Sequence, residues 1–478
     1  MRTISILLTL LLVGCIENKE VLYTKQATFP EGATTEEKID IAARVVPSPE
    51  QLAWQQLELT AFIHFGINTF TDKEWGDGDE SPELFNPTAL DCEQWVRTLQ
   101  RGGFKMAILT AKHHDGFCLW PTATTNHSVA NSPWRNGRGD VVRELSDACR
   151  KHGMKFGLYL SPWDRNAECY GNSPAYNRLY IAQLTELLTH YGPIDEVWFD
   201  GACGEGPNGK RQIYDWESIL STVRRLQPHA VTAIMGDDVR WVGNEGGRGR
   251  ATEWSVTPYT PQCYSHGPEA NAALGLEEMT PDLGSRELIA KANGVYWYPS
   301  EVDVSIRPGW FHHATEDDQV RSLANLVDIY FSSVGSNSVL LLNIPPDRRG
   351  LIHEIDAQRL EDFGLYISHT FEESLLKDDV SPWHAAEGDS VEYEVIEGIK
   401  ANTLLISEDI ERGQRVERFS VEALMNGEWR PIATGTTIGY KRLIRFDECS
   451  PECIRITIDE CRATAHIANV GLYYAEPL

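Results

Sequence analysis

The sequence predicts an α/β fold, a (β/α)8-like barrel, followed by a C-terminal all-β sandwich. Between residues 50 and 370, short β-branched segments alternate with segments of helical periodicity, and strands recur about every 40 residues. This alternation favours a parallel sheet. From about residue 385 onward, apolar residues recur with period two, and Asn426-Gly427 separates two such runs, which indicates a β-hairpin. A chain of 478 residues can hold a large barrel and one accessory module.

The predicted barrel elements follow one another in regular order, and Gly153 and Gly192 stand where glycine commonly ends a helix. The predicted strands are 59–65, 105–110, 155–160, 195–199 and 230–235, and the predicted helices are 89–100, 140–152, 176–191 and 214–226. Glycine is dense between 236 and 295, and the alternation then resumes with a strand at 295–298, a helix at 317–333 and a strand at 339–343. We therefore expect the barrel domain to span 46–375 and the sandwich, an accessory module of galactose-binding type, to span 380–478.

The N-terminus resembles a bacterial lipoprotein signal. Arg2 precedes an apolar run, residues 4–13, that is too short to cross a bilayer. The run ends in Leu12-Val13-Gly14-Cys15, which is similar to a lipobox, and polar residues follow it. We predict a signal over residues 1–15, a lipid on Cys15 as the means of membrane attachment, and a linker over residues 16–45. The expected location is the bacterial cell envelope, in the periplasm or on the outer-membrane surface. An ordinary signal peptide is the alternative.

Charge and cysteine content limit the possible partners. The formal net charge of −27 argues against nucleic acid or an anionic membrane surface as a partner. No G-x-G-x-x-G opens a helix near the first strand, and no C-x-x-C pair suggests structural zinc. We therefore predict neither a cofactor nor a metal. Nine cysteines remain besides Cys15, and the group Cys449, Cys453 and Cys461 could include one disulfide.

Ionisable and aromatic residues follow five consecutive predicted strands. In a barrel of this kind, the active site forms at the carboxyl ends of the strands. The residues at these ends are His64, the run 112–117 with His113 and His114, the run 161–164 with Trp163, Asp200, and the run 237–241 with Arg240. We therefore expect these side chains to meet in one cavity.

Two kinds of chemistry fit this set of residues. His64, His113 and Asp200 could converge on a metal ion, as in hydrolytic metal barrels. Alternatively, histidine and tryptophan bind a sugar while two carboxylates carry out glycoside hydrolysis. Asp200 suits the role of nucleophile, since it ends an apolar strand and precedes the small residues Gly201 and Ala202. Candidates for the acid/base partner are Glu205, Glu245, Glu253 and Glu301.

Four motifs together resemble glycoside hydrolase family 29, the α-L-fucosidases, over about residues 45–370. They are Phe62-Ile63-His64-Phe65-Gly66, Lys112-His113-His114-Asp115-Gly116-Phe117, Trp198-Phe199-Asp200-Gly201 and Arg240-Trp241. The resemblance implies a retaining mechanism, with Asp200 as the nucleophile that forms a covalent fucosyl intermediate. It also implies a fucosylated oligosaccharide or glycoconjugate as the substrate. The residues implied in sugar binding are His64, His113, His114, Arg240, Trp198, the pair Glu74-Trp75, and either Tyr159 or Trp163.

Further segments resemble the subgroup that is selective for α-1,3/1,4 linkages in branched, Lewis-type glycans. These segments are 241–247, 252–255 and 301–310. In that subgroup the glutamate matching Glu245 protonates the leaving oxygen, and the surrounding glycines permit a loop tip that reaches the cavity. Glu301 is the second choice for this role, or else a contact to a neighbouring galactose. Trp310 and Trp297 are candidates for stacking against sugar.

Four rival interpretations remain open at this level. The chain could be an exo-glycosidase of another specificity, an α-L-fucosidase of broader linkage preference, a metal hydrolase, or a non-catalytic glycan-binding lipoprotein. The presence of both Asp200 and a nearby glutamate argues against the last of these.

Overall fold

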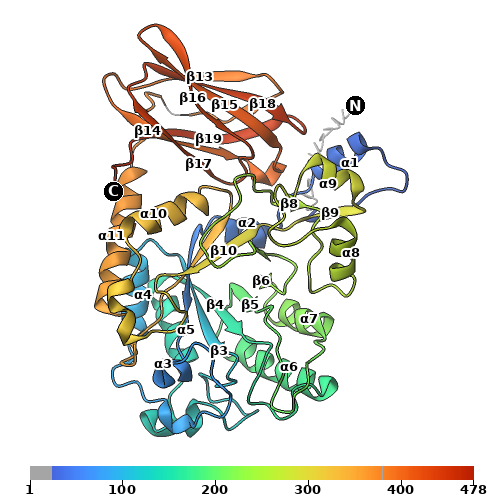
Figure 1. The fold of residues 1–478 in the computed structure, drawn as a ribbon, viewed down its shortest axis with the longest axis vertical. Helices are drawn as coiled ribbons and strands as arrows, with labels where there is room; N and C mark the ends of the chain where they lie inside the picture. The colour runs from blue at the N-terminus through green and yellow to red at the C-terminus, as the bar shows by residue number, and fades with distance from the viewer. Residues whose placement is uncertain (1–23, 379) are drawn as a thin grey trace, which may run out of the picture.

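The computed structural model describes residues 24–378 and 380–478, and its larger part is a barrel of eight parallel strands (Figure 1). The strands are β2 (Leu59–Ile63), β3 (Met106–Lys112), β4 (Lys155–Leu160), β5 (Glu196–Phe199), β6 (Val231–Ile234), β7 (Arg240–Trp241), β10 (Ser300–Ser305) and β11 (Val339–Asn343). β11 pairs with β2, and a bridge between Ala233 and Val239 joins β6 to the start of β7. The predicted (β/α)8-like barrel is therefore confirmed.

Helices surround this barrel and cover the outer face of its strands. They are α4 (Cys92–Arg101), α5 (Val141–His152), α6 (Ser173–His190), α7 (Trp216–Leu226), α10 (Leu323–Ser332) and α11 (Glu354–Thr370). Asp91, Asp140 and Asp215 each cap the start of a helix by accepting a backbone N–H three residues on. Every residue of β2 and β3 is buried, as expected for strands covered on two sides.

The barrel interior has its own apolar core. Helix α2 (Pro49–Gln55) contributes Trp54, which belongs to the same buried cluster as Met106 and Leu341. The shorter helices are α1 (Thr35–Ala42), α3 (Ile67–Thr71), α8 (Gly267–Leu274) and α9 (Arg286–Lys291), with 3₁₀ turns at Pro82–Leu84, Val129–Asn131, Trp134–Gly137, Ala314–Gln319 and Ile410–Arg412.

The barrel departs from regular alternation at β6 and β7, where no helix separates the two strands. Residues 235–239 make the whole connection, and Ile234 adopts a φ of 66° at its start. A β-branched residue rarely adopts this left-handed conformation, which costs about 1–3 kcal/mol. Strain is therefore concentrated at the end of β6.

Two strands of the segment between β7 and β10 join an N-terminal strand in a small sheet outside the barrel. Its strands are β1 (Gln26–Thr28), β9 (Gly294–Trp297) and β8 (Val256–Thr257), in that antiparallel order. The prediction that 295–298 is a barrel strand is therefore wrong, since β10 takes that place. The predicted helix at 317–333 is also shorter, because a 3₁₀ turn precedes α10.

The N-terminal predictions have different outcomes. The linker expected over 16–45 is wrong for most of its length, because β1 pairs with β9 and α1 buries Ile39 and Ala42. Thr34 and Glu37 form a capping box that fixes the start of α1. The signal at residues 1–15 and the lipidated Cys15 lie outside the described residues.

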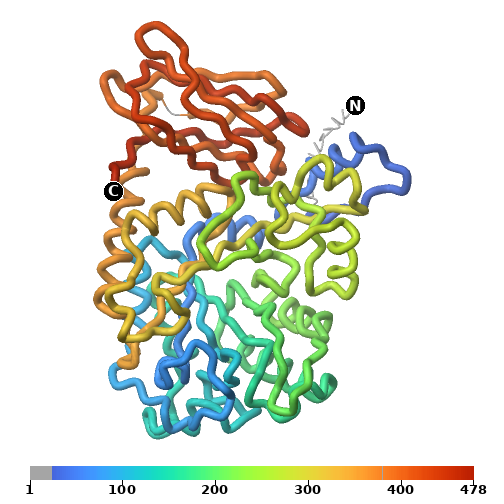
Figure 2. Tube along the Cα trace, in the orientation of Figure 1, coloured from blue at the N-terminus to red at the C-terminus, as the bar shows by residue number. Residues whose placement is uncertain are grey.

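The C-terminal part is a sandwich of two antiparallel four-stranded sheets (Figures 1 and 2). One sheet holds β12 (Trp383–Ala385), β19 (Ala465–Tyr473), β14 (Ala401–Glu408) and β17 (Arg442–Cys449), and the other holds β13 (Ser390–Glu394), β18 (Cys453–Cys461), β15 (Val416–Met425) and β16 (Glu428–Gly435). Asn426 and Gly427, with φ of 53° and 74°, form the predicted turn between β15 and β16. The possible disulfide near the end is absent from the described residues, since Cys449, Cys453 and Cys461 are all free.

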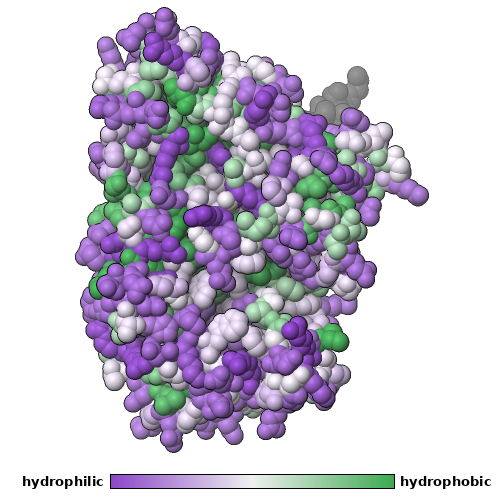
Figure 3. Space-filling model, in the orientation of Figure 1, coloured by the Kyte–Doolittle hydropathy of each residue, from purple (hydrophilic) through white to green (hydrophobic). Residues whose placement is uncertain are grey.

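Hydrophilic residues predominate on the face shown in Figure 3, with small apolar areas between them. Within residues 24–378 and 380–478, no helix has the length and hydrophobicity needed to cross a bilayer.

Candidate active site

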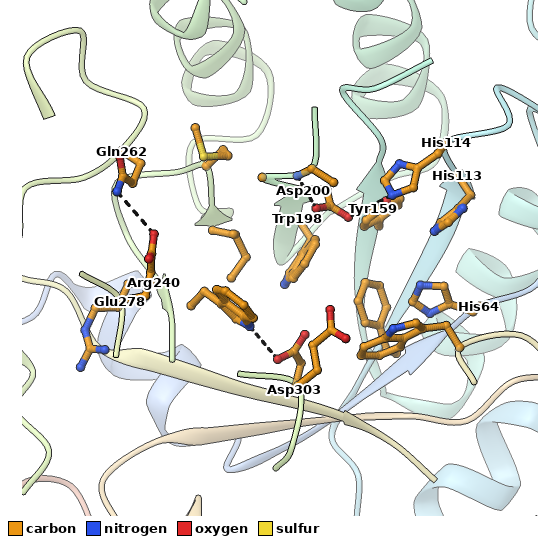
Figure 4. Close-up of a pocket in the computed structure, with 18 of the residues that line it drawn as sticks. His64, His113, His114, Tyr159, Trp198, Asp200, Arg240, Gln262, Glu278 and Asp303 are labelled. Carbon is orange, nitrogen blue, oxygen red and sulfur yellow. Dashed lines mark hydrogen bonds and ion pairs between the residues drawn. The ribbon is translucent and has the colours of Figure 1, made fainter. Parts of the chain in front are cut away.

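A cavity of about 590 Å³ lies at the carboxyl ends of the barrel strands (Figure 4). Aromatic side chains and ionisable groups from both halves of the barrel line it. The lining includes Phe62, His64, Trp75, His113, His114, Tyr159, Trp198, Asp200, Ile234, Met235, Arg240, Trp241, Glu245, Tyr259, Gln262, Glu278, Asp303 and Trp310. The structure thus brings most of the site residues predicted from the sequence into one cavity.

Asp200 follows β5 directly and is held in a fixed orientation. The Tyr159 hydroxyl donates to Asp200 Oδ2 at 2.9 Å, and the Ala202 N–H donates to Oδ1 at 2.8 Å. Tyr159 reaches it because β4 and β5 pair with Tyr159 opposite Trp198, two residues before the aspartate. The Asp200 side chain remains 24% exposed. One carboxylate is therefore positioned by the barrel and still open to a ligand.

The three histidines form a wall beside Asp200. Their ring centroids lie 5.5 Å apart for His64 and His113, and 4.2 Å apart for His113 and His114. His64 Nδ1 lies 2.8 Å from Asn343 Oδ1, and His114 Nδ1 lies 2.7 Å from Ser161 Oγ. His114 Nε2 is 3.7 Å from Asp200 Oδ2.

Burial keeps these imidazoles neutral. It lowers the pKa of His64 to about 3, lowers the pKa of His113 well below its ordinary value, and also lowers that of His114. A neutral imidazole carries one donor and one acceptor nitrogen, which suits hydroxyl groups. Among the described residues, the clusters whose ligand atoms would allow a metal are His312-Asp317-His353 and Asp77-Asp79-Glu80, so His64, His113 and Asp200 do not form one.

Arg240 begins β7 and is fully buried at the cavity edge. Its Nε donates to the Tyr298 carbonyl at 2.9 Å, and its Nη2 contacts the Glu253 carboxylate and the Trp254 carbonyl, the latter at 3.1 Å. Its Nη1 has no protein acceptor within the described part of the chain. This nitrogen is itself buried, so it remains an unsatisfied donor beside the cavity.

Glu245 lies on the loop after β7, between Gly243 and Gly247, whose φ values of 101° and 73° favour glycine. Desolvation raises the pKa of Glu245, the charges of Asp200 and Glu74 raise it further, and a hydrogen bond with Trp310 opposes them.

Asp303 also lines the cavity. Burial raises the pKa of Asp303 to about 7, although Trp241 Nε1 donates to its Oδ1 at 2.7 Å. The cavity therefore combines one exposed carboxylate with a second carboxyl group that holds its proton more tightly.

Four residues predicted to contact sugar lie outside the cavity lining, namely Trp163, Glu74, Glu301 and Trp297. Trp163 is 9% exposed and packs behind His114 and Trp75, with its Nε1 donating to the Glu205 carbonyl. Of the two alternatives at that strand end, Tyr159 is the one in the cavity. Glu74 accepts the Trp310 N–H at 2.7 Å and the Phe311 N–H at 3.1 Å, so it orients the loop that carries Trp310.

Glu301 lies beneath the cavity floor instead of on its surface. It is 1% exposed, and its Oε2 accepts the Trp198 Nε1–H at 2.8 Å. The indole therefore separates this carboxyl group from the cavity, and the geometry does not support Glu301 as acid/base or as a sugar contact. Trp297 is fully buried in β9, where its Nε1 donates to Gln55 Oε1, and it does not line the cavity, so its proposed stacking role is wrong.

The sequence motifs missed one wall of the cavity. Tyr259, Gln262 and Glu278 form it, with Gln262 Nε2 donating to Tyr259 Oη at 2.6 Å and Tyr259 Oη donating to Glu278 Oε1 at 3.0 Å. Gln262 Nε2 also donates to Glu278 Oε1 at 3.4 Å (Figure 4). All three come from the glycine-dense segment between β7 and β10, where neither periodicity nor a strand end indicates a position.

Comparisons with known proteins agree with this geometry. A sequence model described as alpha-L-fucosidase matches residues 53–372. The "Alpha-L-fucosidase 1" of Arabidopsis thaliana is 41% identical over 460 residues, covering 90% of this chain and 87% of that protein. A crystal structure from Bacteroides ovatus, assigned as an α-L-fucosidase, is 62% identical with a TM-score of 0.94, covering 95% of this chain and 78% of that one. A Ruminococcus gnavus family 29 fucosidase in complex with fucose is 29% identical with a TM-score of 0.79, covering 96% and 98% of the two chains.

Glu196, at the start of β5, is a fully buried carboxyl group. Glu196 accepts the Trp54 Nε1–H at 2.7 Å, and burial raises its pKa to about 8. In the unfolded chain the Glu196 carboxyl loses its proton at about pH 4.3. The free energy of unfolding should therefore fall as pH rises from that value to about 8. Glu196→Gln keeps the acceptor and removes the titration. We expect it to stabilise the protein more at pH 7.5 than at pH 5, by up to about 1.4 kcal/mol per pH unit, in urea unfolding experiments. A change of equal size at both pH values would contradict this.

Proposed function

Because the chain belongs to the α-L-fucosidase family of glycoside hydrolases, we propose that it is a retaining exo-enzyme that removes terminal α-1,3- or α-1,4-linked L-fucose from branched, Lewis-type glycans. The observation that carries this proposal is the placement of Asp200. It is an oriented, accessible carboxylate in a cavity that also holds Glu245, whose pKa is raised.

The proposed reaction proceeds in two steps. Asp200 attacks the anomeric carbon of fucose while Glu245 gives its proton to the leaving glycosidic oxygen, so that a fucosyl ester forms and the C–O bond to the rest of the glycan breaks. Glu245 then accepts a proton from water, whose oxygen attacks the same carbon and releases fucose and the Asp200 carboxylate. The raised pKa of Glu245 supports the first role, since a general acid must be protonated before it acts.

The surrounding side chains support binding of a neutral sugar. His64, His113 and His114 are uncharged and can exchange hydrogen bonds with hydroxyl groups. Arg240 also lines the cavity and is the cationic residue that the family resemblance assigns to sugar binding. Trp75, Trp198 and Trp310 offer aromatic faces to the apolar side of a pyranose.

The linkage preference rests on two features. Segments 241–247 and 252–255 resemble the α-1,3/1,4-selective subgroup, and the first of them carries Glu245. The cavity also extends past Asp200 and Met235 to the wall of Tyr259, Gln262 and Glu278, which offers polar contacts to a sugar attached to the fucose.

We also propose that the enzyme works in the bacterial cell envelope, anchored by a lipid on Cys15. The lipobox-like Leu12-Val13-Gly14-Cys15 supports this location. Labelling of expressing cells with a radioactive or alkyne-bearing fatty acid should mark the wild-type protein and leave Cys15→Ala unmarked.

Removal of the nucleophile should abolish turnover. We expect Asp200→Ala to lower kcat by roughly 10⁴-fold or more, as for other essential catalytic side chains, with little change in thermal unfolding. Asp200→Asn, which keeps the size of the side chain, is the control for effects of the space that alanine leaves. The measurement is fucose release from 3- and 4-linked fucosyl oligosaccharides, and folded Asp200→Ala with wild-type activity would contradict the assignment.

Azide should restore activity when the acid/base is removed. On an aryl fucoside whose leaving group needs no proton, Glu245→Ala should regain rate with added azide, because the small anion occupies the vacated space and attacks the fucosyl intermediate. Glu278→Ala is the matched control, since Glu278 is a second carboxylate of the same cavity, and we expect no azide effect there. Rescue in Glu278→Ala alone would move the acid/base role to that residue.

Product analysis tests the linkage preference. With 2-, 3- and 4-linked fucosyl oligosaccharides at equal concentration, we expect release from the branched 3- and 4-linked compounds to exceed release from the 2-linked compound by at least about tenfold, a difference of about 1.4 kcal/mol in transition-state binding. Comparable rates on all three would establish the broader specificity instead.

A further inference from the structure

The buried contacts of Arg240 lead out of the barrel to one short segment, residues 252–255. Arg240 Nη2 binds the Glu253 carboxylate and the Trp254 carbonyl. The Glu253 carboxylate is 1% exposed and also accepts from Arg250 Nη1 at 3.0 Å, so one carboxylate serves two guanidinium groups. The direction of the Arg240 side chain therefore depends on the position of this segment.

Side chains of the C-terminal sandwich hold the backbone of the same segment. Gln414 Nε2 donates to the Glu253 carbonyl at 2.9 Å, and Gln414 Oε1 accepts the Ser255 N–H at 2.7 Å. The Thr437 hydroxyl accepts the Glu253 N–H at 3.0 Å. Gln414 and Thr437 are each 1% exposed. The sandwich thus supplies hydrogen-bond partners for both backbone groups of Glu253. Because these groups are buried, water could not replace Gln414 and Thr437 if their side chains were removed.

The residue next to Glu253 is held from the same side. The Arg462 guanidinium lies 3.5 Å from the centre of the Trp254 ring, and Trp254 Nε1 donates to Asp282 Oδ1 at 2.7 Å. Arg462 is buried and comes from the sandwich. Since the Trp254 carbonyl is itself an acceptor for Arg240, the sandwich supports both groups that bind Arg240 Nη2.

The barrel alone gives Arg240 little support. Strand β7 has two residues, and on its β6 side the connection is a single bridge. The Tyr298 carbonyl is the remaining acceptor for the guanidinium. A planar guanidinium binds well only when its N–H groups point at their acceptors, so a shift of the 252–255 segment would displace the Arg240 side chain from the cavity lining.

We propose that the C-terminal sandwich is part of the sugar-binding machinery, in which Gln414 and Thr437 are positioning residues that orient Arg240 through Glu253. This inference rests on the proposed function, in which Arg240 contributes to sugar binding. It assigns the sandwich a role in ligand affinity whether or not that domain binds carbohydrate on its own surface.

A double-mutant cycle tests the coupling. The dissociation constant of L-fucose is measured by calorimetry for the wild-type protein, Gln414→Ala, Arg240→Ala and the double variant, together with KM and kcat on a 4-linked fucosyl oligosaccharide. We expect Gln414→Ala to weaken fucose binding about tenfold and to raise KM more than it lowers kcat. In the Arg240→Ala background the same substitution should have no further effect. Thr437→Val, which removes the acceptor at nearly constant volume, should repeat the result if Gln414→Ala folds poorly.

Asp328→Ala is the matched control. Asp328 makes an exposed ion pair with Arg445, which also joins barrel and sandwich but does not touch residues 252–255. We expect it to leave fucose affinity unchanged. Unaltered affinity in folded Gln414→Ala and Thr437→Val, or an equal loss with and without Arg240, would overturn the inference. If Arg240→Ala alone bound fucose as tightly as the wild-type protein, the role of Arg240 in the proposed function would fail, and this inference with it.

Discussion

The hydrogen bond from the Tyr159 hydroxyl to the Asp200 carboxylate fixes the centre of the cavity. It exists because β4 and β5 are parallel neighbours whose register sets Tyr159 opposite Trp198. The two rings stack at 5.4 Å, and Trp198 in turn donates to the buried Glu301. The orientation of one exposed carboxylate thus depends on contacts that run through the barrel interior, where close packing leaves little freedom for adjustment.

Burial determines the charge of the groups around Asp200. His64 and His113 are almost fully enclosed and remain neutral, while Asp303 and Glu245 hold their protons more tightly than exposed carboxyl groups do. A cavity lined with charged histidines and carboxylates would bind water and ions strongly. Neutral donors and acceptors instead favour a sugar, whose hydroxyl groups carry no charge.

The carboxyl ends of the first four barrel strands could be predicted from the sequence because the carboxyl ends of parallel strands must meet. Arg240, which was expected to follow the fifth strand, instead begins the separate strand β7. His64, His113 and Asp200 follow from that rule alone. The choice of 295–298 over β10 was wrong because Glu301 and Asp303 suggest a loop. In the barrel interior, indole N–H groups of Trp198 and Trp241 bond these carboxyl groups and allow their burial. Tyr259, Gln262 and Glu278 could not be predicted, since tertiary packing of a long insertion places them.

The connection between β6 and β7 accounts for both the shape of the cavity and the need for the sandwich. A regular barrel would place a helix there, whereas this chain turns back within five residues and accepts an unfavourable φ at Ile234. The space beside β7 is then filled by the insertion that carries Glu245 and Glu278. A two-residue strand cannot hold such an insertion by ladder hydrogen bonds, so its backbone is bonded to Gln414 and Thr437 instead. The irregular side of the barrel is therefore held in place by hydrogen bonds from the second domain.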